Sequence, residues 1–327
     1  MTVQTSISTK NIVVLGAGAW GTALALHCHR QNHTVHLWAR RKEVADTITA
    51  YNENTVYLPN VSTQGIHATS NLKYASQADI VLLAVPSQHI RPVLSQLYLP
   101  KHAVIVICCK GIERDSMKLM NTIVQEYFPN NTINILSGPS FAMEVAHNKI
   151  TTLTLAGSST NVVYDALNSP TLRLYSTRDV IGAEITGAIK NVIAIASGIG
   201  IGLKLGNNAQ AGLITRSLFE IQKLNNVLGG QQETLMMPCG IGDLMLTCSS
   251  LQSRNMSFGL EIAKKRPIQD ILDNTHTITE GYYNTVSIHQ LSTHHNIDMP
   301  IVNCIYEVLY QNKDIDTALK DLLNTPY

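Results

Sequence analysis

The stretch IVVLGAGAWG, residues 12–21, joins a short apolar run to a glycine-rich turn. Its last six residues fit the pattern G-x-G-x-x-G, with glycines at Gly16, Gly18 and Gly21. In such a turn the first glycine permits a tight bend and the second lets the backbone approach a pyrophosphate. The third allows a helix to pack closely on a strand. The pattern alone is a weak signal, and an ordinary structural turn is the alternative.

The segments around this turn favour a dinucleotide site. A helix-compatible stretch runs from Trp20 to about Gln31, and Thr34–Trp38 has the composition of a second strand. Strand, turn, helix and second strand therefore follow one another within about 30 residues, the order that dinucleotide sites require. The N-terminus of the helix would supply N–H donors and a positive dipole to the phosphates.

The end of the second strand indicates which dinucleotide is preferred. NAD sites usually place an acidic residue there to bind the ribose 2′-hydroxyl. This chain has Trp38-Ala39-Arg40-Arg41, and the first acidic residue after it is Glu43. A guanidinium makes charge-assisted hydrogen bonds to a 2′-phosphate. We therefore predict NADP(H) binding through Arg40, with Arg41 as a second contact and NAD(H) still usable; a solvated basic turn is the alternative.

Further apolar runs extend the pattern through the first half of the chain. They lie at 79–85, 103–108, 133–136 and 151–155. Continuous apolar runs separated by helix-length segments indicate a parallel sheet that is covered on both faces. The sequence therefore predicts an α/β fold with a Rossmann-like, doubly wound parallel sheet.

The pattern changes after about residue 180. Apolar residues then recur at helical spacing, as in Ile214, Leu218, Ile221, Leu224 and Leu228. We predict a dinucleotide-binding domain at residues 1–184 and a mostly α-helical substrate and catalytic domain at residues 185–327.

Composition argues against several other classes of protein. The 24 Lys and Arg residues balance 23 Asp and Glu residues, so no nucleic-acid binding through bulk charge is expected. A hydrophobic content of 45% with only 14% charged residues excludes a disordered chain. The apolar stretch 181–206 contains Glu184, Lys190 and Lys204, which argues against a membrane-spanning helix. Residues 1–10 lack the apolar segment of a secretory signal, so a cytoplasmic location is expected.

Cysteine and histidine spacing suggests no metal site. The six cysteines form no C-x-x-C pair, and the twelve histidines are scattered. Reduced and mostly buried thiols are the expected state. We therefore predict no metal ligands.

Lys190 is the strongest candidate for chemistry. It lies in GAIKNVIAIA, residues 187–196, among small and aliphatic residues, where a lysine is costly to desolvate unless it is partnered. Burial lowers the pKa of such an amine, and an anionic ligand raises it. Lys190 is therefore a candidate proton donor or acceptor beside a carbonyl or alcohol. The alternative is a lysine that snorkels from one face of an amphipathic helix.

Other polar segments could join this lysine in one cleft. Ser253-Arg254-Asn255 can bind a phosphate through fixed N–H and O–H donors. The segments 110–111 and 137–140 each follow a predicted strand, where ligand clefts of open α/β sheets lie. Ordinary turn chemistry is the alternative for each segment, and spacing alone does not bring them together.

The chain resembles bacterial NAD(P)-dependent glycerol-3-phosphate dehydrogenases across nearly its whole length. The segments that carry this resemblance are GAGAWGTALA from Gly16, KGIE from Lys110, GPSFAMEVA from Gly138, IKNVIAIASGIGIGLKLGNNAQAGLITRSLFEI from Ile189, GIGDLMLTCSSLQSRNMSFG from Gly240 and TEGYYN from Thr279. Their order and spacing agree with the predicted two-domain division. The chain departs from the family at Cys109, where threonine is more usual, and at Thr279, where alanine is.

The resemblance implies interconversion of dihydroxyacetone phosphate and sn-glycerol 3-phosphate for phospholipid synthesis, in a homodimer. It implies that Lys190 is the general acid/base. Residues expected at the substrate are Lys110, Gly138, Ser140, Lys190, Asn191, Asp243, Thr247, Ser253, Arg254 and Asn255. Residues expected at the cofactor are Gly16, Gly18, Trp20, Gly21, Arg40, Arg41, Lys110, Ala142, Arg254, Ile278 and Glu280.

Two other functions share some of these features. A reductase of the β-hydroxyacid or ketopantoate type also has the glycine turn and a helical second domain. A non-catalytic NADPH-binding regulator would need the turn but not Lys190.

Overall fold

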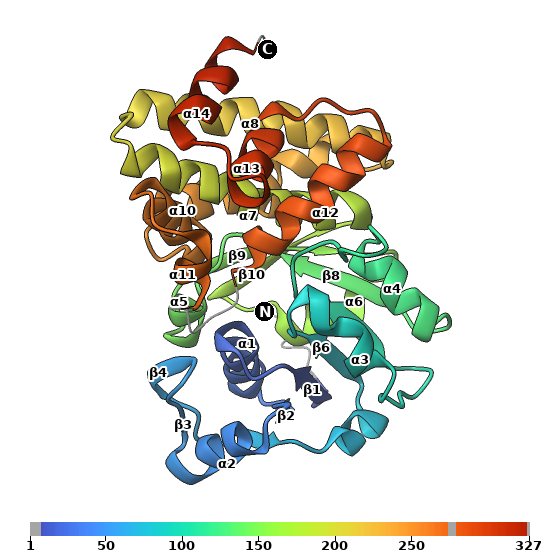
Figure 1. Ribbon diagram of the computed structural model, residues 1–327. Coiled ribbons are helices and arrows are strands. Elements are labelled where there is room, and N and C mark those ends of the chain that lie inside the picture. The colour runs from blue at the N-terminus through green and yellow to red at the C-terminus, as the bar shows by residue number, and fades with distance from the viewer. Residues whose placement is uncertain (1–7, 274–278, 326–327) are drawn as a thin grey trace.

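The N-terminal half of the chain is built around one eight-stranded sheet (Figure 1). The computed structural model describes residues 8–273 and 279–325. The strands are β1 (Asn11–Leu15), β2 (Thr34–Trp38), β5 (His67–Thr69), β6 (Ile80–Leu83), β7 (Val104–Ile107), β8 (Ile133–Ser137), β9 (Thr151–Ala156) and β10 (Leu172–Thr177). Their order across the sheet is β10-β9-β8-β7-β6-β1-β2-β5. A separate hairpin pairs β3 (Glu53–Asn54) with β4 (Leu58–Ser62).

Strand β1 lies where the strand order reverses. It pairs in parallel with β2 on one side and with β6 on the other, so that Leu15 lies between Trp38 and Leu83. Alternate side chains of β1 enter different cores: Ile12 and Val14 join one apolar cluster, and Val13 and Leu15 join another. Because successive side chains of a strand point to opposite faces, these two clusters cover both faces of the sheet. The predicted Rossmann-like, doubly wound α/β fold is confirmed.

One detail of the predicted parallel sheet is wrong. Strand β9 pairs antiparallel to β8, with Leu136 opposite Leu155. A parallel pair needs a crossover that carries the chain back along the sheet, usually on a helix. The segment between these two strands contains only the five-residue helix α5 (Ala142–Ala146), which packs against α1 (Ala19–Arg30).

Two strands of the sheet were not predicted. β5 has only three residues, and β10 lies at the sheet edge with alternating buried and exposed residues. Neither strand has the continuous apolar run that marks a strand buried on both faces.

Short helices cover the two faces of the sheet. They are α1, α2 (Lys42–Tyr51), α3 (Ile90–Leu94), α4 (Met120–Tyr127), α5 and α6 (Asn161–Leu167), with 3₁₀ turns η1 (Leu72–Gln77) and η2 (Ser87–His89). Residues of α1, α5 and α6 join the same apolar cluster as Ile12 and Val14. Residues of α3 and α4 join the cluster of Val13 and Leu15, so the sheet is enclosed between two helical layers.

The second half of the chain is helical and surrounds α7 (Val180–Gly202). The other elements are α8 (Asn207–Val227), η3 (Gln232–Met236), η4 (Pro238–Gly242), α9 (Asp243–Ser249), α10 (Arg254–Ala263), α11 (Ile268–Asp273), α12 (Glu280–His294), α13 (Pro300–Tyr310) and α14 (Ile315–Asn324). Helices α7 and α10 cross in close backbone contact. A Cβ atom on Gly259 would lie 2.1 Å from the Ile195 carbonyl oxygen, so any larger residue there would push the helices apart.

The transition between the two halves lies at the start of α7. Strand β10 ends at Thr177, and Asp179 then caps α7 by accepting a hydrogen bond from the Gly182 N–H. The boundary expected between residues 184 and 185 falls inside this helix, whose buried residues join the helical core from Ile185 onward.

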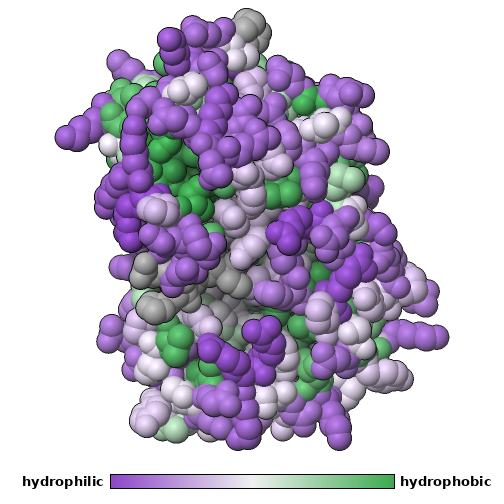
Figure 2. All heavy atoms as spheres, in the orientation of Figure 1, coloured by the Kyte–Doolittle hydropathy of each residue, from purple (hydrophilic) through white to green (hydrophobic). Residues whose placement is uncertain are grey.

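Helix α7 is also long and apolar enough to cross a membrane. In the described part of the chain, 78% of the most apolar stretch of α7 is buried inside the protein, so protein packing accounts for its apolar composition. The surface in Figure 2 is mostly hydrophilic, with hydrophobic side chains gathered on the left of the helical half.

Candidate active site

A cavity of about 800 Å³ opens at the carboxyl ends of the parallel strands. The segments that follow four of these strands contribute to its lining: Gly16–Trp20 after β1, Ala39–Arg41 after β2, Ala84–Pro86 after β6, and Cys108–Lys110 after β7. The helical half closes the other side with residues of α7, α9, α10 and α12. Ligands of open α/β sheets bind at this edge, where the strand order reverses.

The three glycines of the turn differ in what surrounds them. Gly16 has φ of +116°, and a Cβ atom there would lie 2.7 Å from the Ala84 carbonyl oxygen. At Gly18 a Cβ atom would meet nothing within 4 Å, so the backbone faces open space. At Gly21 it would lie 1.9 Å from the Gly16 carbonyl oxygen. Gly21 therefore lies behind the cavity lining and lets α1 pack on the turn.

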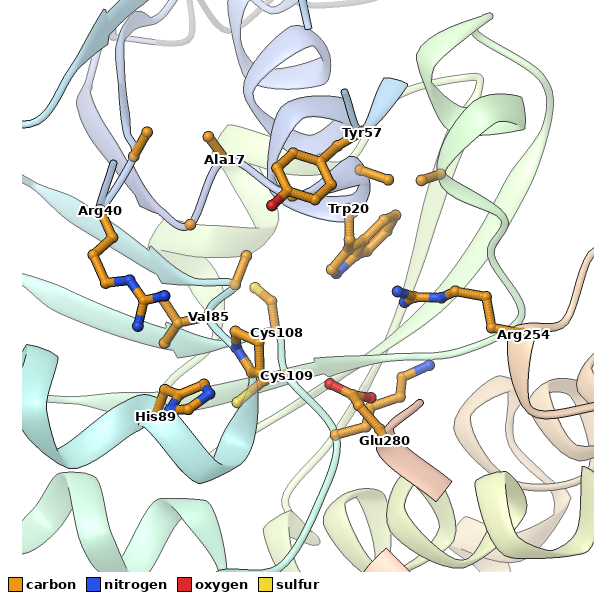
Figure 3. Close-up of a pocket in the computed structure, with 18 of the residues that line it drawn as sticks. Ala17, Trp20, Arg40, Tyr57, Val85, His89, Cys108, Cys109, Arg254 and Glu280 are labelled. Carbon is orange, nitrogen blue, oxygen red and sulfur yellow. The ribbon is translucent and has the colours of Figure 1, made fainter. Parts of the chain in front are cut away.

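The basic residues after β2 lie at the rim of the same cavity. Arg40 and Arg41 are both exposed and line it, and the Arg41 Nη2 donates a hydrogen bond of 2.7 Å to the Tyr57 hydroxyl. Figure 3 shows Arg40 on the left and Trp20 and Tyr57 near the top of the cavity. In the described structure, the segment directly after β2 contributes no carboxylate to the cavity lining.

Two lysines share one buried carboxylate at the inner end of the cavity. Lys190 Nζ lies 2.9 Å from Asp243 Oδ1, and Lys110 Nζ lies 2.5 Å from Asp243 Oδ2. Asp243 is 1% exposed, and Lys190 is 7% exposed. Lys190 therefore does not snorkel to solvent. With both lysines protonated and the aspartate ionised, this cluster carries an excess positive charge, which favours an anionic ligand in the cavity.

Burial lowers the pKa of Lys190 to about 8. Removal from water disfavours the ammonium, and the positive charge of Lys110 acts in the same direction. The carboxylate of Asp243 opposes both effects and keeps the pKa from falling further. An amine with a pKa close to neutrality can both give and accept a proton, which is the property a general acid/base needs.

Helix α9 supplies two partners of Lys190 from one face. Asp243 is its first residue, and Thr247 follows one turn later. Lys190 Nζ donates a hydrogen bond of 2.7 Å to Thr247 Oγ1, and that hydroxyl donates one of 2.6 Å to the Asp243 carbonyl oxygen. The hydroxyl proton is thus committed to the backbone, and the hydroxyl oxygen fixes the direction of the amine.

A second polar network joins α7, α10 and α12. Asn255 Nδ2 donates to Asn191 Oδ1 at 2.9 Å, and Asn255 Oδ1 accepts from the Gly281 N–H at 2.9 Å. The Asn191 Nδ2 is buried and has no hydrogen-bond partner within the described ranges. Asn191 also lines the cavity, so its amide is a donor available to a ligand.

Other predicted residues occupy neighbouring positions. Ser253 caps α10 by accepting from the Met256 N–H, while Arg254 lines the cavity with Glu280, the first residue of α12. In Figure 3 Arg254 enters the cavity from the right, above Glu280. Burial raises the pKa of the Glu280 carboxyl group, and Arg254 and the two active-site lysines oppose this effect. Ile278 lies outside the described residues.

The loop after β8 contributes in two ways. Ser140 and Ala142 line the cavity. Gly138 lies behind the lining, and its carbonyl oxygen accepts hydrogen bonds from Lys110 Nζ and Ser140 Oγ. Asp243 also lies behind the lining. In the described structure, Asp243 therefore holds both lysines in place, and the Gly138 carbonyl oxygen holds Lys110.

Sequence reasoning missed several residues of this region. Asn54 contacts the glycine turn, Tyr57 holds Arg41, and Gln88 binds the loop that follows Lys110. Asn54 and Tyr57 belong to the hairpin of β3 and β4, which has no apolar run to mark it. Gln88 lies in the turn after β6, and this position at a strand end was the one signal that could have identified it.

The strand order, the glycine turn and the buried Lys190 define a two-domain, dinucleotide-dependent oxidoreductase, and comparisons with known proteins agree. The sequence profile described as "NAD-dependent glycerol-3-phosphate dehydrogenase N-terminus" matches residues 11–163. The corresponding C-terminus profile matches residues 179–320.

Individual proteins are similar over nearly the whole chain. The glycerol-3-phosphate dehydrogenase [NAD(P)+] of Rhodospirillum rubrum is 42% identical over 97% of this chain and 93% of its own. The crystal structure of glycerol-3-phosphate dehydrogenase from Coxiella burnetii is 36% identical. Its TM-score is 0.93, with coverage of 97% of this chain and 99% of that one. This chain belongs to the NAD-dependent glycerol-3-phosphate dehydrogenase family, as the sequence resemblance predicted.

A ketopantoate reductase from Ralstonia eutropha also shares the fold. It is 15% identical, with a TM-score of 0.59 and coverage of 96% of this chain. At that identity the likeness concerns the fold alone. The family assignment therefore disfavours a reductase of the ketopantoate type.

Proposed function

We propose that this enzyme interconverts dihydroxyacetone phosphate and sn-glycerol 3-phosphate, with Lys190 as the general acid/base. The observation that carries this proposal is the Lys190 amine, which is buried at the cavity and held by Asp243 and Thr247. An amine so placed can deliver a proton to a ketone oxygen. The family membership supports the choice of substrate.

The cavity fits a nicotinamide dinucleotide. The open space in front of Gly18 gives a pyrophosphate access to the backbone, and the N-terminus of α1 points its free N–H groups to the same place. When bound, the dinucleotide supplies or accepts the hydride. The residues that would hold it are Gly16, Gly18, Trp20, Arg40, Arg41, Lys110, Ala142, Arg254 and Glu280, all of which line the cavity.

The protein's own contribution to ketone reduction is electrostatic and acid–base. Negative charge grows on the carbonyl oxygen of the substrate during reduction. The Lys190 ammonium stabilises that charge and then donates its proton to the oxygen. In the opposite direction the neutral Lys190 amine accepts the hydroxyl proton. Asp243 keeps the pKa of Lys190 near neutrality by opposing the effect of burial.

The substrate phosphate is held by donors from the helical half. Arg254 offers a guanidinium at the cavity, and Asn255 lies beside it at the start of α10. The unpartnered Asn191 Nδ2 provides a further donor near Lys190. Because these groups bind the phosphate and not the reacting carbonyl itself, their binding free energy positions the carbonyl for reaction.

The same reasoning supports a preference for NADP(H) over NAD(H). Arg40 and Arg41 are the charged residues at the end of β2, where a 2′-phosphate would lie. We further propose that the enzyme works in the cytoplasm as a homodimer and supplies glycerol 3-phosphate to phospholipid synthesis. The family resemblance supports these last points.

A spectrophotometric assay of the purified protein tests the proposed reaction. Oxidation of NADPH and of NADH is followed with dihydroxyacetone phosphate, and separately with a carboxylated ketone such as ketopantoate. We expect turnover with the phosphorylated ketone and a higher kcat/KM with NADPH. Turnover with ketopantoate alone would support the related reductase, and cofactor binding without any turnover would support a regulator.

A further inference from the structure

Asn54 lies beneath the glycine turn, outside every motif that the sequence displays. It is the second residue of β3 and is 1% exposed. Its Nδ2 donates to the Ala17 carbonyl oxygen at 2.9 Å and to Thr22 Oγ1 at 2.8 Å. Both amide protons are thus used inside the protein, on two partners that belong to the turn and the first turn of α1.

Thr22 extends this contact to the next peptide group. Its hydroxyl donates to the Gly18 carbonyl oxygen at 2.8 Å while its oxygen accepts from Asn54. The Thr22 N–H also donates to the Gly18 carbonyl oxygen, at 3.0 Å. Asn54 and Thr22 therefore fix the carbonyl groups of Ala17 and Gly18, the two central peptide groups of the turn.

The direction of these carbonyls determines where the turn presents its donors. Both peptides are trans, and in a planar trans peptide the N–H points opposite to the C=O of the preceding residue. Since the Ala17 and Gly18 carbonyls point inward to Asn54 and Thr22, the N–H groups of Gly18 and Ala19 point outward. That side is the cavity, which Gly18 and Ala19 line.

The same side chain connects the turn to the basic rim. Asn54 Oδ1 accepts from the Tyr57 N–H at 3.3 Å, and the Tyr57 hydroxyl accepts from Arg41. In Figure 3 Ala17 and Tyr57 lie on the same side of the cavity, near Trp20. One buried amide thus links the hairpin that holds Arg41 to the turn that faces the pyrophosphate.

We propose that Asn54 is a positioning residue for the dinucleotide: it orients the Gly18 and Ala19 N–H groups toward the pyrophosphate through its hydrogen bonds to Ala17 and Thr22. This role rests on the proposed binding of a nicotinamide dinucleotide, but not on a preference for NADPH. It concerns cofactor affinity and leaves proton transfer by Lys190 unchanged.

The central test replaces the Asn54 donors while keeping the shape of the side chain. Asn54→Asp puts an oxygen where Nδ2 faces the Ala17 carbonyl oxygen, so the carbonyl loses its donor and turns away. We expect the Kd for NADH, measured by fluorescence titration, to rise at least about tenfold. The kcat at saturating cofactor should stay within about twofold of wild type, because Lys190 and its partners are untouched.

Thr22 provides a matched pair that probes the other end of the network. Thr22→Val keeps the shape and removes the hydroxyl, whereas Thr22→Ser keeps the hydroxyl. We expect Thr22→Val to weaken NADH binding by a similar factor and Thr22→Ser to bind within about threefold of wild type. If Asn54→Asp does not fold, as judged by thermal unfolding, this pair decides the question alone.

The results that would contradict the role of Asn54 differ from those that would contradict the NADPH preference. An unchanged NADH Kd in Asn54→Asp, equal binding by the two Thr22 variants, or a loss confined to kcat would overturn the role of Asn54.

Tyr57→Phe tests the proposed NADPH preference separately, because it removes only the hydroxyl that holds Arg41. Selective weakening of NADPH is expected there; an unchanged NADPH Kd would count against the 2′-phosphate assignment and leave the NADH result for Asn54 standing.

Discussion

At the scale of single residues, the site depends on how one carboxylate is shared. Asp243 binds both Lys110 and Lys190 and is itself 1% exposed. Removing one partner of a buried ion pair typically destabilises a protein by about 3–5 kcal/mol, because the other charge is left without compensation. Asp243 therefore needs both lysines as partners, and in turn it opposes the effect of burial on the pKa of Lys190.

The pH dependence of turnover should follow Lys190. Its pKa of about 8 means that the ammonium predominates below pH 8 and the neutral amine above it. Ketone reduction needs the ammonium, so its kcat/KM should fall as the pH rises above about 8. Oxidation of glycerol 3-phosphate needs the amine, so its kcat/KM should fall as the pH drops below about 8. Identical pH profiles in both directions would argue against Lys190.

Arg254 should act through the substrate phosphate. Arg254→Ala removes the guanidinium at the cavity, so we expect kcat/KM for dihydroxyacetone phosphate to fall by at least about tenfold. Arg254→Lys keeps the charge without the fork geometry and should recover part of the loss. The control substrate is dihydroxyacetone, which has no phosphate. An equal loss with that substrate would show that Arg254 does not bind the phosphate.

Arg40 should determine cofactor choice. Arg40→Asp replaces a cation at the end of β2 with the anion that NAD sites place there. We expect the ratio of kcat/KM for NADPH to that for NADH to fall at least about tenfold, because repulsion replaces attraction at the 2′-phosphate. Steady-state kinetics with both cofactors measure this ratio. A ratio that does not change would place the 2′-phosphate elsewhere.

At the scale of elements, the ends of helices position most of the site. Asp243 begins α9, Arg254 begins α10 and Glu280 begins α12. Helix α7 passes between them and carries Lys190. Gly259 lets α10 approach the α7 backbone so closely that its first turn reaches the cavity. The close packing of these helices thus sets the distance between Arg254 and the Lys190 amine in the cavity.

Glu184, a buried carboxylate in α7, should make the free energy of unfolding depend on pH. Burial raises the pKa of Glu184 from 4.5 to about 8, although its Oε1 accepts from the Asn121 N–H at the start of α4. Between these two pH values the folded chain keeps a proton that the unfolded chain has lost, so the unfolding free energy falls as pH rises. Glu184→Gln should remove this slope.

Denaturant unfolding of wild type and Glu184→Gln at about pH 5 and about pH 8 measures the effect. Relative to wild type, the variant should gain at least about 1 kcal/mol between the two pH values, the equivalent of one pKa unit. At about pH 5 the side chain at position 184 is neutral in both folded proteins, which provides the internal control. A parallel pH dependence in the two proteins would show that Glu184 ionises normally.

The sequence predicted the elements that form because of short, local patterns of residues. The glycine turn, the strands β1, β2, β6 and β7, and the helical second half are each encoded in short patterns of residues. The antiparallel pairing of β9 was not visible, because it depends on where the chain returns after α5. Asn54 was not visible either, because a single buried amide in a two-residue strand has no pattern around it.

At the scale of the whole molecule, the proposed active site lies where the core of the sheet half meets the core of the helical half. The sheet half supplies the glycine turn and Lys110, and the helical half supplies Lys190, Asp243 and Arg254. Lys110 and Asp243 are 133 residues apart in the chain. Their contact could not be derived from spacing, although the resemblance to a known family implied that both residues serve one site.

The most direct test of this arrangement is the single-turnover rate of NADPH oxidation by Lys190→Ala with dihydroxyacetone phosphate. Loss of a positioned acid should slow the reaction at least about a hundredfold. NADPH binding, titrated on the same protein, should stay within about threefold of wild type, because the glycine turn and basic rim are intact. A rate close to wild type would mean that the proton comes from another group, and Lys190 would not be the acid.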